Sequence, residues 1–87
     1  MHVIEDDFHA EPQDGEFATF EDAVSELERR SKIPWDEEPN RCPCTSWRTC
    51  HRDYVVIEYD TDALPWTELS RKYVLKISSA GVEWLDD

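Results

Sequence analysis

The chain has 87 residues, with 21 Asp and Glu against nine Lys and Arg, which gives a formal net charge of -12. This length fits one small domain, residues 1–87, because so short a chain has no room for a second hydrophobic core. The acidic balance argues against direct binding of nucleic acid, which requires clustered Lys and Arg. No apolar run approaches the roughly 18 residues of a membrane span, and no secretory signal is present, so we expect a cytoplasmic protein without a membrane partner.

The first 14 residues are predicted to be a flexible, solvated end of the domain. Two histidines and three acids stand there together, a mixture that can bind a metal weakly but is more typical of a frayed terminus. These residues are His2, Glu5, Asp6, Asp7 and His9. Short apolar pieces at 3–4 or 15–17 could each add a strand, although acids interrupt both.

The clearest predicted element is a helix over about 20–32. Phe20, Ala23, Val24 and Leu27 recur at helical spacing and make one apolar stripe. Thr19 can cap the start, with an acid three residues later, and Pro34 disfavours helical geometry just before it.

Two segments with a period of two follow. Residues 53–59 are apolar on both faces, which is typical of a central strand. Residues 72–78 alternate as expected for a strand with one wet face, and a turn at 79–81 allows residues 82–85 to return as a hairpin. We expect one helical turn within 64–70. The fold class is therefore α+β, with a small antiparallel sheet of three to four strands packed against one main helix.

Residues 34–52 are predicted to form a long loop that contains all three cysteines and several arginines. Three thiols and one imidazole suffice to coordinate zinc, and the candidate ligands are Cys42, Cys44, Cys50 and His51. The spacing differs from familiar zinc knuckles, because Cys50 and His51 are adjacent and neighbouring residues usually point apart. Reduced thiols without a cofactor are the preferred interpretation, with zinc or a disulfide as alternatives. Flanking arginines could nevertheless make Cys44 or Cys50 reactive.

No catalytic signature is present, so we expect a protein that is not an enzyme. The adjacent Cys50 and His51 lack an oxyanion-hole motif, and two glycines cannot build a phosphate-cradling loop. Carboxylates are so abundant that a pair for acid–base catalysis has the same sequence pattern as a solvated acidic face.

The charge is uneven, because residues 1–44 carry 13 acids and four bases whereas residues 45–87 carry eight acids and five bases. The chain has four tryptophans, and Trp35, Trp66 and Trp84 stand near acids, a combination found in binding sites for basic partners. Trp47, Trp66 and Trp84 are expected mainly in the core, whereas Trp35 fits either core or interface. The expected contact surface is Trp35, Asp36, Glu37 and Glu38, with Glu5, Asp6 and Asp7 contributing electrostatic steering.

In size, charge and helix-plus-sheet plan, the chain resembles the small acidic immunity proteins and inhibitors that bacteria and their phages make against nuclease-type toxins or defence complexes. The resemblance implies a non-enzymatic protein that neutralises a basic protein partner by occlusion. The basic, cysteine-containing loop departs from a uniformly acidic mimic. The alternative is a small zinc-binding structural or interaction module that uses this loop. The sequence leaves the oligomeric state open.

Overall fold

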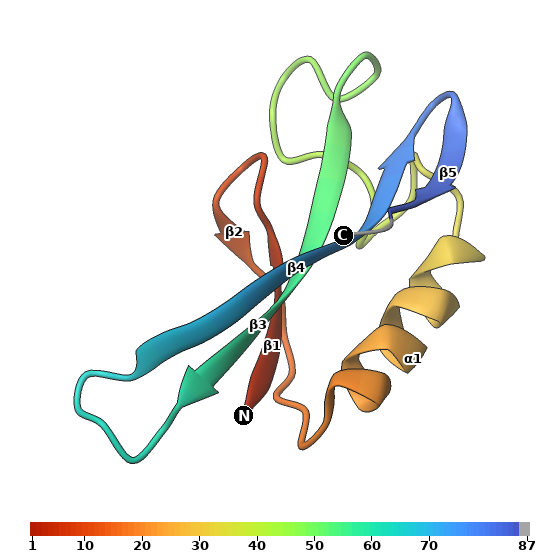
Figure 1. Ribbon diagram of the computed structural model, residues 1–87. Coiled ribbons are helices and arrows are strands. Elements are labelled where there is room, and N and C mark those ends of the chain that lie inside the picture. The colour runs from red at the N-terminus through yellow and green to blue at the C-terminus, as the bar shows by residue number, and fades with distance from the viewer. Residues whose placement is uncertain (86–87) are drawn as a thin grey trace.

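The computed structural model describes residues 1–85, which form a five-stranded antiparallel sheet with one α-helix packed on one face (Figure 1). The spatial order of the strands is β2-β1-β3-β4-β5. The elements are β1 (His2–Asp6), β2 (Glu11–Pro12), α1 (Phe20–Ser31), β3 (His51–Asp60), β4 (Thr67–Ser78) and β5 (Gly81–Trp84). The α+β class and the helix are confirmed. The sheet is larger than predicted, because the amino-terminal segment expected to be flexible supplies β1 and β2.

Strand β3 lies at the centre of the sheet, as its two apolar faces predicted. Tyr54 and Val56 face α1, whereas Val55 and Ile57 are buried on the side without a helix. The register explains that burial, because Val55 has cross-strand partners in both β1 and β4, and so does Ile57. Neighbouring side chains therefore cover this face in place of a second helix.

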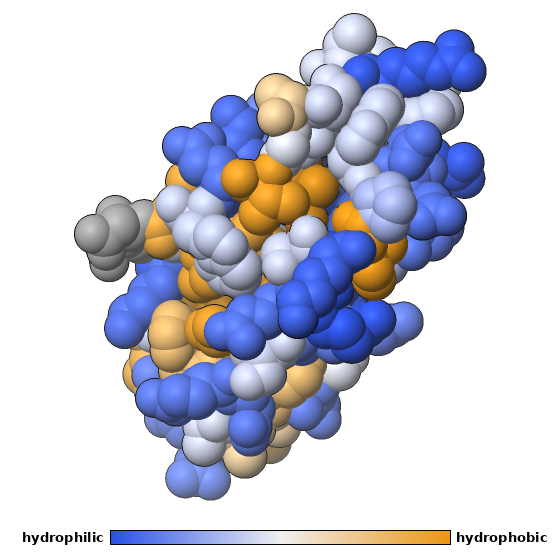
Figure 2. Space-filling model, turned by 90° about the vertical axis from the view of Figure 1, so that its right-hand side faces the viewer, coloured by the Kyte–Doolittle hydropathy of each residue, from blue (hydrophilic) through white to orange (hydrophobic). Residues whose placement is uncertain are grey.

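Helix α1 begins as the sequence indicates, because the Thr19 hydroxyl accepts a hydrogen bond from the backbone N–H of Asp22 at 3.1 Å. The helix packs against β1, β3 and β4. A groove of about 410 Å³ lies beside it, lined by apolar residues of α1, β4 and β5 together with Glu28 and Lys72. Figure 2 shows this side of the molecule, where apolar side chains reach the surface between charged ones.

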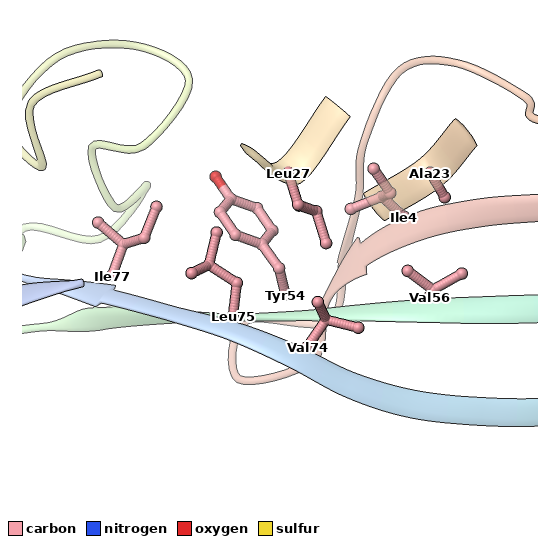
Figure 3. Close-up of a cluster of buried hydrophobic side chains, with 8 residues drawn as sticks. All are labelled: Ile4, Ala23, Leu27, Tyr54, Val56, Val74, Leu75 and Ile77. Atoms are coloured by element: carbon pink, nitrogen blue, oxygen red, sulfur yellow. The ribbon is translucent and has the colours of Figure 1, made fainter. Parts of the chain in front are cut away.

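The core fills the space between α1 and the sheet (Figure 3). Ala23 and Leu27 project from the helix onto Tyr54 of β3 and Leu75 of β4, and all four are fully buried. The other members of this cluster are Ile4, Val56, Val74 and Ile77. Burial of such side chains contributes about 1.5 to 3 kcal/mol each, so this cluster supplies most of the stability of the fold.

Two local predictions are wrong. The helical turn expected within 64–70 is absent, because Thr67–Ser70 already belongs to β4 and pairs with the end of β3. Trp66 and Trp84 are 41% and 49% exposed instead of lying in the core, and Trp47 is only half-buried. Trp84 lies on the edge strand β5, and Trp66 lies in the β3–β4 connection, where it contacts the ring of Tyr59.

Residues 32–50 connect α1 to β3 through turns and bends. Asn40 anchors this connection, because its buried amide donates to the carbonyls of Arg30 and Ile33 at 2.8 and 2.9 Å. The same side chain accepts from the hydroxyl of Tyr54 at 3.1 Å, so the loop is tied to the central strand. Within residues 1–85, no helix has the length and apolar character needed to cross a bilayer.

Candidate metal centre

A cluster of metal-ligating side chains forms where the β1–β2 turn meets the loop that precedes β3. The ligand atoms of His9, Cys44 and Cys50 all lie within 4.8 Å of one another. The Nε2 atom of His9 is 3.1 Å from the Sγ atom of Cys50, although 41 residues separate the two in sequence. These three residues are therefore close enough to bind a metal ion.

The fold fixes the orientation of His9. Its Nδ1 atom lies 2.6 Å from a carboxylate oxygen of Asp6, so Nδ1–H donates to Asp6 and Nε2 faces the thiols. Metal-ligating histidines are typically held by such a carboxylate on the opposite ring nitrogen. Burial works to lower the pKa of His9, but hydrogen bonds with Asp6 and Cys44 outweigh it and raise that pKa above its usual value.

Asp6 joins this cluster to the sheet. Its carboxylate is 0% exposed and accepts from the backbone N–H groups of Phe8 and Asp53, and from the guanidinium of Arg52 at 3.0 Å. Asp6 was expected to steer a partner from a flexible, solvated terminus, but it lies buried in β1 and is not available at the surface. The buried pair with Arg52 compensates the charge of Asp6.

Arg52 extends the same network to the cysteine-containing loop. Its guanidinium donates to the carbonyls of Asn40 and Arg41 at 3.1 and 2.7 Å. These two residues immediately precede Cys42. The Asp6–Arg52 pair thus holds both segments of the cluster, the turn that carries His9 and the loop that carries the thiols.

The three cysteines are free thiols in different surroundings. Cys42 is 8% exposed, and burial together with a hydrogen bond to Cys50 raises the pKa of its thiol to about 12. Cys44 is more accessible, and hydrogen bonds with Ser46 and His9 lower the pKa of its thiol to about 7. Cys42 contacts Cys50, although its sulfur lies outside the group of three ligand atoms that are within 4.8 Å of one another. A metal would draw the protons from the remaining thiols when it binds.

The predicted ligand set needs one correction, because His51 does not join the cysteines. Its Nε2 atom lies 3.2 Å from a carboxylate oxygen of Asp53, and its ring packs on Phe8 with centroids 4.2 Å apart. Successive side chains of a strand point to opposite faces, which separates His51 from its neighbour Arg52 and the Asp6 network. The sequence signal missed was the spacing of Asp6 and His9, which lets one residue orient the other across a tight turn.

The residues predicted to contact a partner lie in two places. Trp35 packs against the core and against Trp47, with ring centroids 5.6 Å apart, while Asp36, Glu37 and Glu38 beside it are exposed. Glu5 and Asp7 both form ion pairs with Arg71 of β4, at 3.1 and 2.6 Å.

In comparisons with known proteins, no family model matches the chain, and no curated protein or solved structure does so either. The groove beside α1 offers mainly apolar side chains. The His9 cluster combines metal-ligating atoms with a buried pair, Asp6 and Arg52, that holds His9 in place.

Proposed function

We propose that this chain is a non-catalytic module whose fold is completed by one zinc ion bound by His9, Cys42, Cys44 and Cys50. The observation that carries the proposal is the position of His9, with Nε2 at 3.1 Å from a cysteine sulfur while a buried carboxylate holds Nδ1. Both ring nitrogens of His9 have side-chain partners, unlike those of a histidine that is fully solvated.

The donor set favours zinc over other common cations. Thiolate and imidazole ligands suit zinc, whereas magnesium and calcium require oxygen ligands. Three sulfurs and one nitrogen complete a tetrahedral site and leave no position for a reacting water. The role that fits this set is structural.

A zinc ion would connect two segments that lie far apart in sequence. His9 lies in the β1–β2 turn, and the cysteines lie in or at the end of the 32–50 connection. Domains of this size bury little surface and often gain stability from a structural metal. We assign the protein to the cytoplasm, because reduced thiolate ligands persist where cellular thiols are kept reduced.

The test is the metal content of the protein purified without chelator, followed by zinc titration of two matched histidine variants. We expect about one equivalent of zinc in the wild type. His9→Ala should weaken zinc binding by at least about tenfold, while His51→Ala leaves it unchanged. An equal loss in both variants, or no zinc uptake by the folded wild type, would refute the proposal.

A second proposed function is the neutralisation of a basic protein partner, as the resemblance to immunity and inhibitor proteins implies. The observation that favours it is the face of the sheet opposite α1, where Arg71 lies among three carboxylates. Exposed Trp66 and Leu69 lie on neighbouring parts of β4 and its turn. The three carboxylates belong to Glu5, Asp7 and Glu68. A second acidic group, Asp36 to Glu38, remains available for steering.

The test of this second function is the association rate with a partner captured from lysate, measured at low and at physiological salt. Steering by exposed carboxylates weakens as salt screens them, so the rate should fall. Joint replacement of Asp36, Glu37 and Glu38 by their amides should slow association further. The matched control is Glu21→Gln with Asp22→Asn at the helix start. A rate that depends on neither salt nor these charges would reject this function.

A further inference from the structure

The thiols of the cluster differ in how accessible they are to a small reagent in solution. Cys42 is buried, whereas Cys44 and Cys50 are half-buried. The ligand atoms of Cys44 and Cys50 lie within 4.8 Å of each other. Cys44 lies in a segment of turns and bends, and Cys50 is the residue that precedes β3. The two sulfurs can therefore approach the roughly 2.05 Å of a disulfide without breaking a strand pair.

We propose that Cys44 and Cys50 form a site of oxidative modification, at which a hydroperoxide converts the two thiolates into a disulfide and the bound metal is released. This inference rests on the proposed zinc centre. It adds a regulatory role, because the oxidation state of two ligands then decides whether the metal remains.

The reaction balances with one hydroperoxide and two thiolates. The Cys44 sulfur attacks one peroxide oxygen, the O–O bond breaks, and the distal oxygen leaves as hydroxide or alkoxide. Cys44 has then lost two electrons and is a sulfenic acid. The Cys50 thiolate attacks that sulfur, the S–S bond forms, the S–O bond breaks, and hydroxide departs. Protons from solvent convert the released anions to water and, for an organic hydroperoxide, to an alcohol.

Release of the metal follows from the loss of two ligands. Thiolate is the metal-binding form of cysteine, and a disulfide no longer supplies it. His9 and Cys42 would remain, and two ligands do not hold zinc in a closed tetrahedral site. Burial shields Cys42 from the oxidant, so we expect it to stay reduced. The loop would then keep its polar anchors, Asn40 and Arg52, but lose the metal that joins Cys44 and Cys50 to His9.

The experiment treats the zinc-loaded wild-type protein with hydrogen peroxide and follows free zinc with an indicator dye and free thiols with a thiol reagent. We expect zinc to appear in step with the loss of about two thiols per metal. Mass spectrometric mapping should find the Cys44–Cys50 disulfide, and a dithiol reductant with added zinc should restore the starting state. A disulfide that includes Cys42, or zinc loss without disulfide formation, would overturn the inference.

A variant isolates the first step. In Cys50→Ser the sulfenic acid has no resolving thiol at this position, so a dimedone adduct should form at Cys44 and should be weak or absent in the wild type. Equal labelling of both proteins would overturn the assignment. The two proposals fail separately: a wild type that never binds zinc refutes the metal centre, whereas a zinc-loaded wild type that keeps zinc and thiols under peroxide refutes only the modification.

Discussion

The body of sheet and helix and the 32–50 connection are held together in different ways. In the body, α1 and three strands bury a continuous apolar cluster around Leu27, Tyr54 and Leu75. In the connection, Trp35 packs on this core and polar anchors hold the rest: Asn40 is 2% exposed and binds three partners, and Arg52 binds two loop carbonyls. The difference teaches that the stability of the body depends on shared apolar burial, whereas the conformation of the connection depends on a few individual side chains.

The largest expected effect belongs to the body. Leu27→Ala removes a fully buried side chain from the helix–sheet contact and should reduce the free energy of unfolding by about 3 kcal/mol or more. Urea denaturation of the zinc-loaded protein measures this loss. Zinc affinity of the folded variant should stay within about twofold, because Leu27 belongs to the core cluster, not to the ligand cluster. A comparable loss of zinc affinity would show that the two regions are not separate.

Removal of the metal should act mainly on the connection. At a free zinc concentration about 100-fold above Kd, binding stabilises the fold by about 2.7 kcal/mol, and chelation should therefore lower Tm by about 10 °C or more. Hydrogen exchange should accelerate first in residues 32–50 and in the β1–β2 turn, while β3 and β4 stay protected. An unchanged Tm and exchange pattern after complete chelation would contradict the proposed structural metal.

The link between the two regions is Asp6. Asp6→Asn keeps the shape of the side chain but weakens the orientation of His9, so the Kd for zinc should rise by about 10- to 100-fold. Burial lowers the pKa of His9 and hydrogen bonds with Asp6 and Cys44 raise it, so loss of the Asp6 carboxylate should move the pH below which protons compete with zinc downward. The matched control is Asp7→Asn. Because Asp7 binds Arg71 and not His9, this variant should bind zinc as the wild type does. Identical affinities in Asp6→Asn and wild type would exclude Asp6 as a positioning residue.

The smallest expected effect concerns charge pairing on α1. Hydrogen bonds from Arg29 lower the pKa of Glu26, burial raises it, and a hydrogen bond from Arg30 lowers it further. The net result is a fall of this pKa from 4.5 to about 2. A carboxyl group whose pKa is lowered by folding stabilises the fold at any pH above its pKa in the unfolded chain. This contribution disappears as the pH falls from about 4.5 to about 2. Glu26→Gln should therefore remove less than about 1 kcal/mol of pH-dependent free energy of unfolding, because Arg29 is exposed. A plot of Tm against pH should become flatter at acid pH. Glu28→Gln is the control on the same helix, and an equal flattening there would remove Glu26 as the cause.

Much of the body could be predicted because repeated patterns encode it. The apolar stripe of Phe20 to Leu27 predicted α1, and the two-sided apolar character of 53–59 predicted a central strand. Strand β1 was harder, because two of its five residues, Glu5 and Asp6, are acids. Asp6 points into the protein and is compensated by Arg52, a pairing across 46 residues that no local pattern reveals.

The candidate site could be predicted only in part for the same reason. The short spacing between Cys42, Cys44 and Cys50 marked one segment as a possible ligand source. The histidine could not be chosen locally, because the antiparallel register of β1 on β3 brings the turn with His9 to the thiols. His51 was the nearer histidine in sequence, but its own strand directs it to Asp53.

X-ray absorption spectroscopy of the zinc-loaded protein tests the metal centre most directly, with the two histidine variants as comparison. The expected spectrum has three sulfur ligands at about 2.3 Å and one nitrogen ligand at about 2.0 to 2.1 Å. The nitrogen of an imidazole should disappear in His9→Ala and persist in His51→Ala. A shell of oxygen and nitrogen atoms alone, or an imidazole that survives in His9→Ala, would contradict the proposed coordination.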